Sequence, residues 1–240
     1  MKGAFAVAAV VAAVAAGAVS IADARPVQSP TVLLGTAAAL AADSRSVTLD
    51  VVAVCPERWT VVDARVSFAQ PQASGEGTFA LTCTGSVQSF RVVVPSSGAA
   101  FQLGEARGTA TVVIQRGRTQ QVQDTQTISV QASIDVALPA TARLQGSGSA
   151  VTIDVTFACP AGARGLESYV NVSQGQQAFG TGFYTPTCDG RSHTLSVFVP
   201  ATQGLFEPGA GSAQTFAVVE AVGQASFGVA ENTQLQLVAG

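Results

Sequence analysis

Lysine is absent from this chain apart from Lys2, histidine occurs once, and only four residues are cysteine. So few imidazoles and thiols make a metal site with several ligands hard to assemble. Charged residues are also scarce, and fifteen acids against twelve bases leave a net charge of −3. That balance excludes the basic surface expected of a nucleic-acid-binding protein. An apolar content of 48% is nonetheless enough for folded cores, and 240 residues suffice for one or two domains.

The first 24 residues have the layout of a secretory signal peptide. Lys2 is followed by twenty uncharged residues, 3–22, rich in alanine and valine, and Ala22-Asp23-Ala24 comes next. A basic start, an apolar run and an A-x-A site predict cleavage after Ala24. The alternative is an uncleaved membrane helix, since twenty residues can just span a bilayer. We expect a mature chain, residues 25–240, that is secreted, extracellular or loosely associated with the cell envelope, and has no membrane span.

The rest of the chain is an internal duplication of one unit. Several segments recur at an offset of 104 or 105 residues, which is too long for a solenoid repeat and indicates tandem domains. The matching segments are 47–56 with 151–160, 82–85 with 187–190, 92–95 with 197–200, and 101–104 with 206–209. We therefore expect a signal peptide at 1–24, a first domain at 25–131 and a second domain at 132–240. No Pro/Gly/Ser-rich linker separates the copies, which favours a stiff pair.

Alternation of apolar and polar residues predicts β-strands in both copies. From Val151 to Cys159 every second residue is apolar or cysteine. The first residues that alternate with them, Thr152 and Asp154, are polar. This period of two is typical of a half-buried antiparallel strand. The same alternation, or turn signals around apolar runs, predicts strands at 47–55, 61–68, 90–94, 109–114, 125–130 and 195–199. About seven short strands in each copy, with no convincing amphipathic helix, predict an all-β fold of two antiparallel β-sandwiches.

The four cysteines are expected to be structural. The two cysteines of each copy are 28 and 29 positions apart, and export places them in an oxidising compartment. We predict the bridges Cys55–Cys83 and Cys159–Cys188. No C-x-x-C pair accompanies the single histidine, which argues against a redox or zinc site. A bridged cysteine also cannot serve as a catalytic thiolate.

The order V-x-[LI]-D-V…C-P, C-x-G, V-x-V-P and F-x-x-G, present in both copies, resembles secreted actinobacterial proteins built from tandem immunoglobulin-like repeats. The resemblance implies two tandem immunoglobulin-like, disulfide-bonded sandwiches in an exported protein, and the function of that group is largely uncharacterised. True immunoglobulin domains are matched less well. Their cysteines lie much further apart, and their core tryptophan does not follow the first cysteine as closely as Trp59 follows Cys55.

The candidate catalytic and metal-binding residues are few. His193 is the only imidazole, so a Ser-His-Asp or Cys-His enzyme would have to use it, with Asp189 as the nearby acid. It aligns with Gln88 in the other copy, and no G-x-S-x-G elbow exists, so we predict a surface histidine and no catalytic residue. Asp50 and Asp154 occupy equivalent positions but lie outside any calcium-loop motif. We expect them to be solvated or ion-paired, and no metal or cofactor is predicted.

Two glycine pairs and three aromatic residues are candidate binding features. Gly180-Thr-Gly182 and Gly146-Ser-Gly148 lack the rest of a phosphate-binding loop, and glycine in sandwiches normally serves turns. Trp59, Tyr169 and Tyr184 could form an aromatic binding patch. Their scatter over the two copies favours core or rim positions instead.

Charge differs between the two copies. Residues 25–131 contain eight arginines and seven acids (+1), whereas 132–240 contain three arginines and seven acids (−4). Arg107, Arg116 and Arg118 also fall near one predicted hairpin. Drift between duplicated copies would explain this difference. The alternatives are weak head-to-tail attraction or an anionic surface partner for the first domain.

Taken together, these features predict a non-enzymatic secreted or surface-associated protein that acts in binding, adhesion or envelope architecture. Its expected partner is an extracellular or cell-envelope protein or glycan. The alternative is a secreted small-molecule carrier or inhibitor that uses a cleft at a sandwich end or between the domains.

Overall fold

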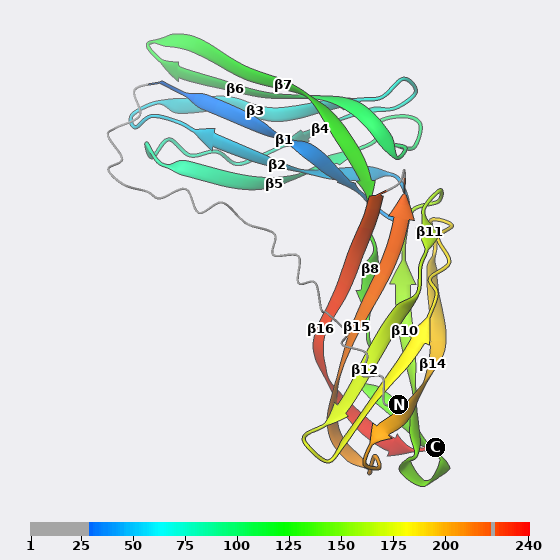
Figure 1. The fold of residues 1–240 in the computed structure, drawn as a ribbon. Coiled ribbons are helices and arrows are strands. Elements are labelled where there is room, and N and C mark those ends of the chain that lie inside the picture. Colours follow the sequence, from blue (N-terminus) through cyan, green and yellow to red (C-terminus); the bar gives the residue numbers. More distant parts are fainter. Residues whose placement is uncertain (1–28, 222–223) are drawn as a thin grey trace, which may run out of the picture.

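A computed structural model describes residues 29–221 and 224–240 of the chain (Figure 1). The expected signal peptide, residues 1–24, lies outside the described residues. Within the described part, regular structure is β-strand throughout, apart from the short 3-10 turn Gly146–Gly148. The strands form two sheets, so the predicted all-β fold of two tandem sandwiches is confirmed. In the described ranges, no helix is long and apolar enough to cross a membrane.

The first sandwich consists of β1 to β7. The strands are β1 (Thr31–Leu40), β2 (Ser46–Val54), β3 (Thr60–Ala69), β4 (Ser74–Thr78), β5 (Val87–Pro95), β6 (Gly104–Arg116) and β7 (Arg118–Ala132). Their order is β4-β3-β6-β7-β1-β2-β5, with β1 antiparallel to β2 and parallel to β7. One layer therefore holds β5, β2 and β1, and the other holds β7, β6, β3 and β4. This is the immunoglobulin-like strand order, with β4 placed beside β3 as in variable-type domains.

The second sandwich repeats this order. Its strands are β8 (Asp135–Ala137), β9 (Thr141–Gln145), β10 (Ala150–Ala158), β11 (Arg164–Gly165), β12 (Ser168–Gln174), β13 (Ala178–Tyr184), β14 (Ser192–Gln203), β15 (Gly209–Ala221) and β16 (Gln224–Ala239). The short strands β8 and β9 together take the place of β1, because both pair with β10 and β9 also runs parallel to β16. Pro139 lies between them and has no N–H to donate to a ladder.

In each sandwich the two layers meet along one edge, which we call the seam, between β4 and β5 in the first and between β13 and β14 in the second. Glycines of β4 and β13 lie at this seam. Gly75 bridges Ser96 in the first copy, and Gly180 pairs with Ala201 in the second. A Cβ at Gly182 would lie only 2.5 Å from the carbonyl oxygen of Phe198, so the backbone of β13 approaches β14 more closely than a side chain allows. The expectation that Gly180 and Gly182 serve a turn is therefore wrong. Gly146 and Gly148 do lie in a turn, with φ of 53° and 90°.

The sandwiches have separate hydrophobic cores. In the first, Phe68 and Phe101 meet edge to face with ring centroids 5.2 Å apart. In the second, Phe157 stacks beside Tyr184 at 6.2 Å. One partly buried side chain, Leu103, packs against both cores, so it links the two at their junction.

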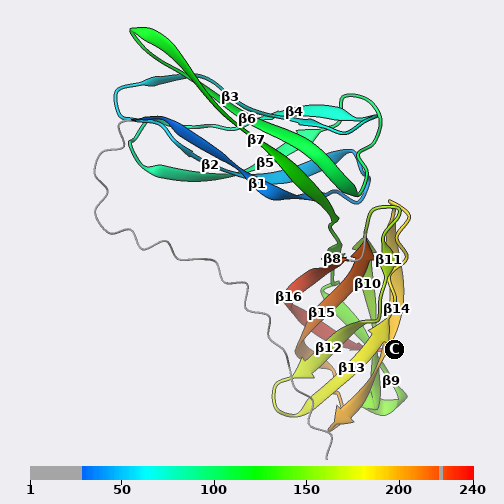
Figure 2. The same cartoon turned by 45° about the horizontal axis from the view of Figure 1, so that its top comes forward.

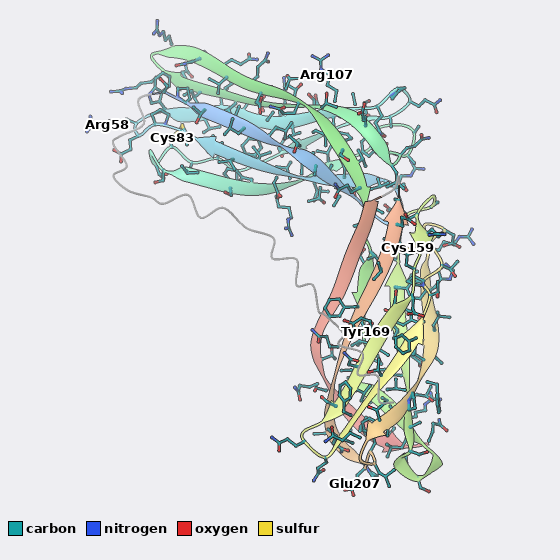
Figure 3. All side chains as sticks on the ribbon, in the orientation of Figure 1. Arg58, Cys83, Arg107, Cys159, Tyr169 and Glu207 are labelled. Atoms are coloured by element: carbon teal, nitrogen blue, oxygen red, sulfur yellow. A yellow bond between two sulfur atoms is a disulfide. The ribbon has the colours of Figure 1, made fainter. Side chains whose placement is uncertain are left out.

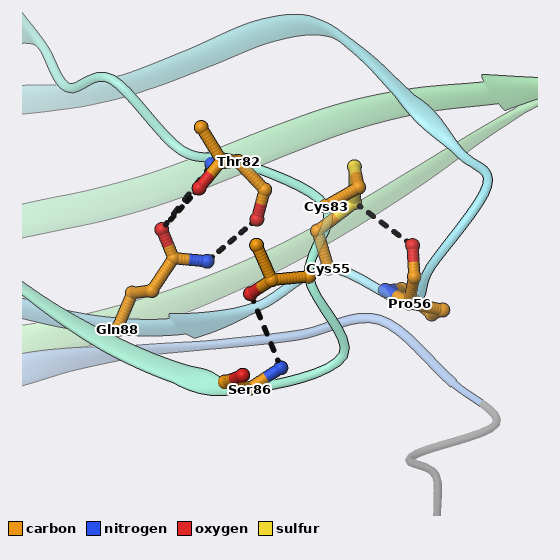
Figure 4. The surroundings of a disulfide bond; sticks show 7 residues. Cys55, Pro56, Thr82, Cys83, Ser86 and Gln88 are labelled. Atoms are coloured by element: carbon orange, nitrogen blue, oxygen red, sulfur yellow. Dashed lines mark hydrogen bonds between the residues drawn. A yellow bond between two sulfur atoms is a disulfide. The ribbon is translucent and has the colours of Figure 1, made fainter.

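A disulfide bond lies at one end of each sandwich. The first joins Cys55 to Cys83 and the second joins Cys159 to Cys188. Cys55 and Cys159 follow β2 and β10 and are fully buried, as the strand alternation requires. Beside the first bridge, the Gln88 side chain holds Thr82: its amide nitrogen donates to the Thr82 carbonyl, and its oxygen accepts from the Thr82 hydroxyl at 2.8 Å (Figure 4).

The two sandwiches meet end to end, with a bend between them (Figure 1 and Figure 2). β7 ends at Ala132 and β8 begins at Asp135, so two residues connect them. In the first sandwich, Leu103 Cδ1 lies 3.8 Å from the position that a Cβ would take at Gly162 of the second sandwich. The carbonyl oxygen of Ala42, also in the first sandwich, lies 3.3 Å from the corresponding Cβ position at Gly190. The disulfide end of the second sandwich thus rests on the opposite end of the first.

Candidate functional site

Four aromatic side chains lie on consecutive strands around the outside of the second sandwich, three of them on β15, β12 and β13 and one on β14 across the seam, and we call them the aromatic row. Tyr169 of β12 lies opposite Phe216 of β15 on one side and Phe183 of β13 on the other. The seam between β13 and β14 brings in Phe198 of β14, whose carbonyl oxygen lies 2.5 Å from the Cβ position of Gly182, the residue before Phe183. Four neighbouring strands therefore carry one ring each, and Figure 3 labels Tyr169 among them.

Strand alternation turns these rings outward. In β13 the even-numbered residues from Ala178 to Tyr184 are buried, which leaves Phe179 and Phe183 on the solvent side. Phe183 is 63% exposed and Phe198 is 60% exposed. Tyr169 and Phe216 are half-buried because they stack on each other, with ring centroids 5.3 Å apart. Adjacent exposed rings of this kind mark interaction surfaces more often than scattered apolar residues do.

Polar side chains border the aromatic row. On one side Asn171 lies opposite both Gln214 and Thr181, and the Thr181 hydroxyl donates to the Asn171 side-chain oxygen at 2.8 Å. On the other side Arg164 donates to Glu220 at 2.7 Å, four residues beyond Phe216 along β15. An apolar centre with a polar rim is the usual composition of a protein-binding surface.

The first sandwich lacks this surface at the same place. Its equivalent row consists of Thr111, Arg65, Thr78 and Val93, because Arg65 of β3 lies opposite both Thr111 and Thr78. The backbone arrangement is shared, but no aromatic ring occupies any of these positions. The aromatic row is therefore a property of the second copy and not of the fold.

The three aromatic residues singled out in the sequence do not come together. Trp59 packs against the core of the first sandwich. Tyr184 is buried in the second, where its hydroxyl lies 2.8 Å from the Thr215 hydroxyl. Burial raises the pKa of Tyr184, and the hydrogen bond to Thr215 partly opposes that rise. Only Tyr169 belongs to the aromatic row. The sequence does contain a signal for the phenylalanines of the aromatic row. Phe198, for example, stands between the buried Val197 and Val199, at a position where strand alternation predicts a polar residue.

His193 lies at the disulfide end of the second sandwich, away from the aromatic row along β14. Its Nε2 is 2.8 Å from Asp189 Oδ1, and its ring stacks on Phe157 at 5.9 Å. The hydrogen bond from His193 is the main cause that lowers the pKa of Asp189, with a smaller contribution from the Arg191 backbone N–H. Gln88, the equivalent of His193, makes a similar local contact to Thr82 in the first copy. The pair therefore braces the loop that follows Cys188.

The other charged candidates are dispersed. Asp50 lies 3.9 Å from Arg91 on the exposed surface, and Asp154 accepts a hydrogen bond from Ser196. Arg116 and Arg118 face each other at the β6–β7 hairpin, whereas Arg107 lies toward the far end of β6, opposite Ala69. Over residues 29–221 and 224–240, no three His, Cys, Asp or Glu side chains are grouped closely enough to hold a metal ion.

A cleft of about 550 Å³ lies where the two sandwiches meet. Its lining combines alanine methyl groups with polar and charged side chains, among them Thr48, Asp50, Arg91 and Asp135. Small-molecule sites are usually apolar cavities with a few polar groups that fix the ligand. This cleft supports the carrier alternative less well than the aromatic row supports binding to a macromolecule.

No protein-family model matches the chain, and no curated protein matches it. Among solved structures, a chain of the crystal structure of Dpr11 IG1 bound to DIP-gamma IG+IG2 is 10% identical, and the match covers 88% of this chain and 98% of that chain, with a TM-score of 0.25. DIP-gamma IG1+IG2 is 11% identical over 88% of this chain and 97% of that chain, with a TM-score of 0.24. At these scores the similarity says nothing about what this protein binds. The immunoglobulin-like assignment follows from the strand order described above.

Proposed function

We propose that this protein is an exported, non-enzymatic binding module, and that the aromatic row of its second sandwich docks onto an apolar patch of an extracellular or cell-envelope protein. The observation that carries the proposal is the high exposure of Phe183 and Phe198 on adjacent strands, beside the stacked pair Tyr169–Phe216. The row is apolar and rimmed by polar groups, which is the composition of the centre of a protein interface.

The energetics favour a partner for these rings. Full burial of an exposed phenylalanine is worth about 1.5–3 kcal/mol, so Phe183 and Phe198 together could supply several kcal/mol to a complex. Aromatic side chains also lose little conformational entropy on binding, because each has only two side-chain torsions. Such anchors commonly carry most of the binding energy of an interface.

A protein partner is favoured over a glycan by the chemistry of the rings. Phe183, Phe198 and Phe216 have no polar atoms, and Tyr169 offers a single hydroxyl. Over the rings themselves, the hydroxyl groups of a sugar would lose water without gaining a hydrogen-bond partner, and only the polar rim could supply one. An apolar protein patch has no such cost.

Two observations support export and a non-enzymatic role. Both sandwiches contain a disulfide bond, which persists in oxidising compartments and is rare in the cytosol. The one histidine, His193, lies at the disulfide end with Asp189, whereas the aromatic row has no titratable group except Tyr169. Catalysis would need nucleophile, base and substrate surface to converge.

Affinity capture with the tagged chain tests the proposal. Protein from the culture medium and envelope of the producing cell is passed over the wild type and over a Phe183→Ser/Phe198→Ser variant. The matched control is Thr78→Ser/Val93→Ser, which changes the equivalent positions of the first sandwich. We expect at least tenfold weaker capture of the partner by the first variant only. Equal capture by all three proteins would refute the proposal, provided that thermal unfolding shows each to be folded.

A further inference from the structure

We propose that copies of this chain associate head to tail, through the ends of the two sandwiches that the intrachain junction leaves free. The outer end of the first sandwich is defined by Arg58, Gly85 and Val87. The outer end of the second is defined by Leu205 and the segment 206–208, which includes Glu207. Figure 3 labels Arg58 and Glu207 at opposite extremities of the molecule. This association is independent of the aromatic row.

The intrachain junction supplies the template. There, Leu103 of the first sandwich packs against the core of the second, with its Cδ1 3.8 Å from the Cβ position of Gly162, and the Ala42 carbonyl oxygen lies 3.3 Å from the Cβ position of Gly190. Because the two copies are offset by 104 or 105 residues, each junction residue has an equivalent at a free end. Gly162 corresponds to Arg58 and Gly190 to Gly85, while Ala42 corresponds to Gly146 and Leu103 to Pro208. The free ends thus repeat the backbone positions of the two ends that meet at the junction.

The loop that carries Leu103 at the junction has the same backbone support at the free end. Gln70 donates to the Gln102 carbonyl and accepts from its N–H, both at 2.8 Å. Gln174 makes the same two hydrogen bonds to Glu207, at 2.9 and 2.8 Å. The loop of the free end is therefore held in the conformation that the joined end uses.

The disulfide ends also match each other. The Gly85 N–H donates to the Cys55 carbonyl at 2.9 Å, as the Gly190 N–H donates to the Cys159 carbonyl at 3.1 Å. Arg58 has a φ of 64° and its equivalent Gly162 a φ of 92°, so this turn also keeps its shape. The free disulfide end therefore has the same backbone contour, with the Glu57 side chain lying over Gly85.

Two side chains at the free ends carry opposite charges, whereas their equivalents at the junction are neutral. Arg58 stands where the junction has Gly162, and Glu207 stands where it has Gln102. Val87 is 67% exposed and replaces Ser192, while Leu205 is 59% exposed and replaces Ala100. Stacking like the junction would place Arg58 against Pro208 and Glu207, beside a cavity of about 490 Å³. Val87 and Leu205 would lie at the rim of the contact, because their equivalents Ser192 and Ala100 stay exposed beside the junction.

Other charges at these ends make the attraction local and modest. Glu57 lies over Gly85, while Arg116 and Arg118 lie at the hairpin next to the start of β3. On the second sandwich, Arg143 lies in β9 near the same loop as Glu207. In the described residues, no carboxylate forms an ion pair with Arg58 or with either hairpin arginine. The association should weaken with added salt, as exposed ion pairs do.

The geometry of such a contact has a consequence. Each chain would offer two different surfaces, so the interface is heterologous and every added copy leaves one free end of each kind. Assembly then continues beyond a dimer unless the rotation closes a ring. A weak interface of this kind gives species that grow with protein concentration.

Sedimentation velocity of the mature chain, residues 25–240, over a hundredfold concentration range tests this proposal. Val87→Arg blocks one end and Leu205→Arg blocks the other. We expect the wild type to show sedimentation coefficients that rise with concentration, and each variant alone to stay monomeric. An equimolar mixture of the two variants should form a heterodimer and nothing larger, because only one functional interface remains. Val93→Arg, at an exposed apolar position of β5 away from both free ends, is the control and should associate like the wild type.

A charge exchange tests the partner residues. Arg58→Glu and Glu207→Arg should each weaken association at least fivefold, and both changes in one chain should restore it. A wild type that is monomeric throughout, a blocked variant that associates normally, or a mixture without heterodimers would overturn the proposal. Phe183→Ser/Phe198→Ser should leave association unchanged. Loss of association in that variant would assign self-contact to the aromatic row and would also overturn the head-to-tail assignment.

Discussion

Gln174 holds the backbone of Glu207 at both of its polar groups. Its Nε2 donates to the Glu207 carbonyl oxygen at 2.9 Å, and its Oε1 accepts from the Glu207 N–H at 2.8 Å. The Gln174 side chain is itself buried. The glutamine amide thus pairs with the N–H and the carbonyl of one residue, as a neighbouring strand would, and fixes a loop that has no regular structure of its own.

Gln174→Ala should therefore lower the free energy of unfolding by about 1–3 kcal/mol, because two partly buried backbone groups lose their partner. Gln176→Ala, in the exposed β12–β13 turn, is the control and should have almost no effect. Urea denaturation of the two variants measures the difference. Equal stability of both would show that solvent replaces the Gln174 contacts without cost.

Gly182→Ala should destabilise the second sandwich by about 1–3 kcal/mol, since the added methyl group must push β13 away from β14. Its Cβ would lie 2.5 Å from the Phe198 carbonyl oxygen. Gly98→Ala serves as the comparison, because nothing lies within 4 Å of its Cβ position. Thermal unfolding should show a lower midpoint for the first variant alone. An unchanged midpoint for Gly182→Ala would mean that the seam is looser than described.

Replacing Cys55 and Cys83 with alanine should lower the stability of the first sandwich by about 2–5 kcal/mol. We propose that the two sandwiches are separate domains, because each has its own core and its own disulfide. Calorimetry of the variant should then resolve two transitions, one lowered and one near its original midpoint. The shared contact of Leu103 allows a shift of a few degrees in the second. A single transition lowered as a whole would contradict the division.

His193→Gln should raise the pKa of Asp189 toward its ordinary value, because the hydrogen bond from His193 is the main cause that lowers it. A carboxyl group with a lowered pKa in the folded state stabilises the fold above its unfolded pKa of roughly 4, and that contribution is lost as the pH falls through the folded value. NMR titration of the Asp189 carboxyl carbon measures the change. Arg191→Gln keeps the backbone N–H and should shift the pKa less. An unchanged titration in His193→Gln would refute the assigned cause.

The fold could be predicted largely from local patterns. Strand alternation around Cys159 and the offset of about 105 residues are visible in the sequence, and both depend only on which residues face inward. Comparison of the copies could also have shown that Gly75 and Gly77 recur as Gly180 and Gly182. That repeat indicates a close backbone approach and not a turn.

The aromatic row could not be predicted in the same way. Tyr169, Phe183, Phe198 and Phe216 lie on four strands, and alternation says only that each faces outward. Their alignment depends on the register of three strand pairings, which the seam glycines and the core set together. The head-to-tail surfaces depend likewise on which ends the junction covers, and this is a property of the folded pair.

The most direct test of the binding role is site-specific photocrosslinking. A photoreactive phenylalanine analogue replaces Phe183 in one protein and Thr78, its equivalent in the first sandwich, in another. Both are exposed to the envelope and medium proteins of the producing cell and irradiated. The aromatic-row account predicts one defined crosslinked partner from position 183 and none from position 78. Equal labelling from both positions, or no crosslink from 183 under conditions where the wild type captures a partner, would contradict it.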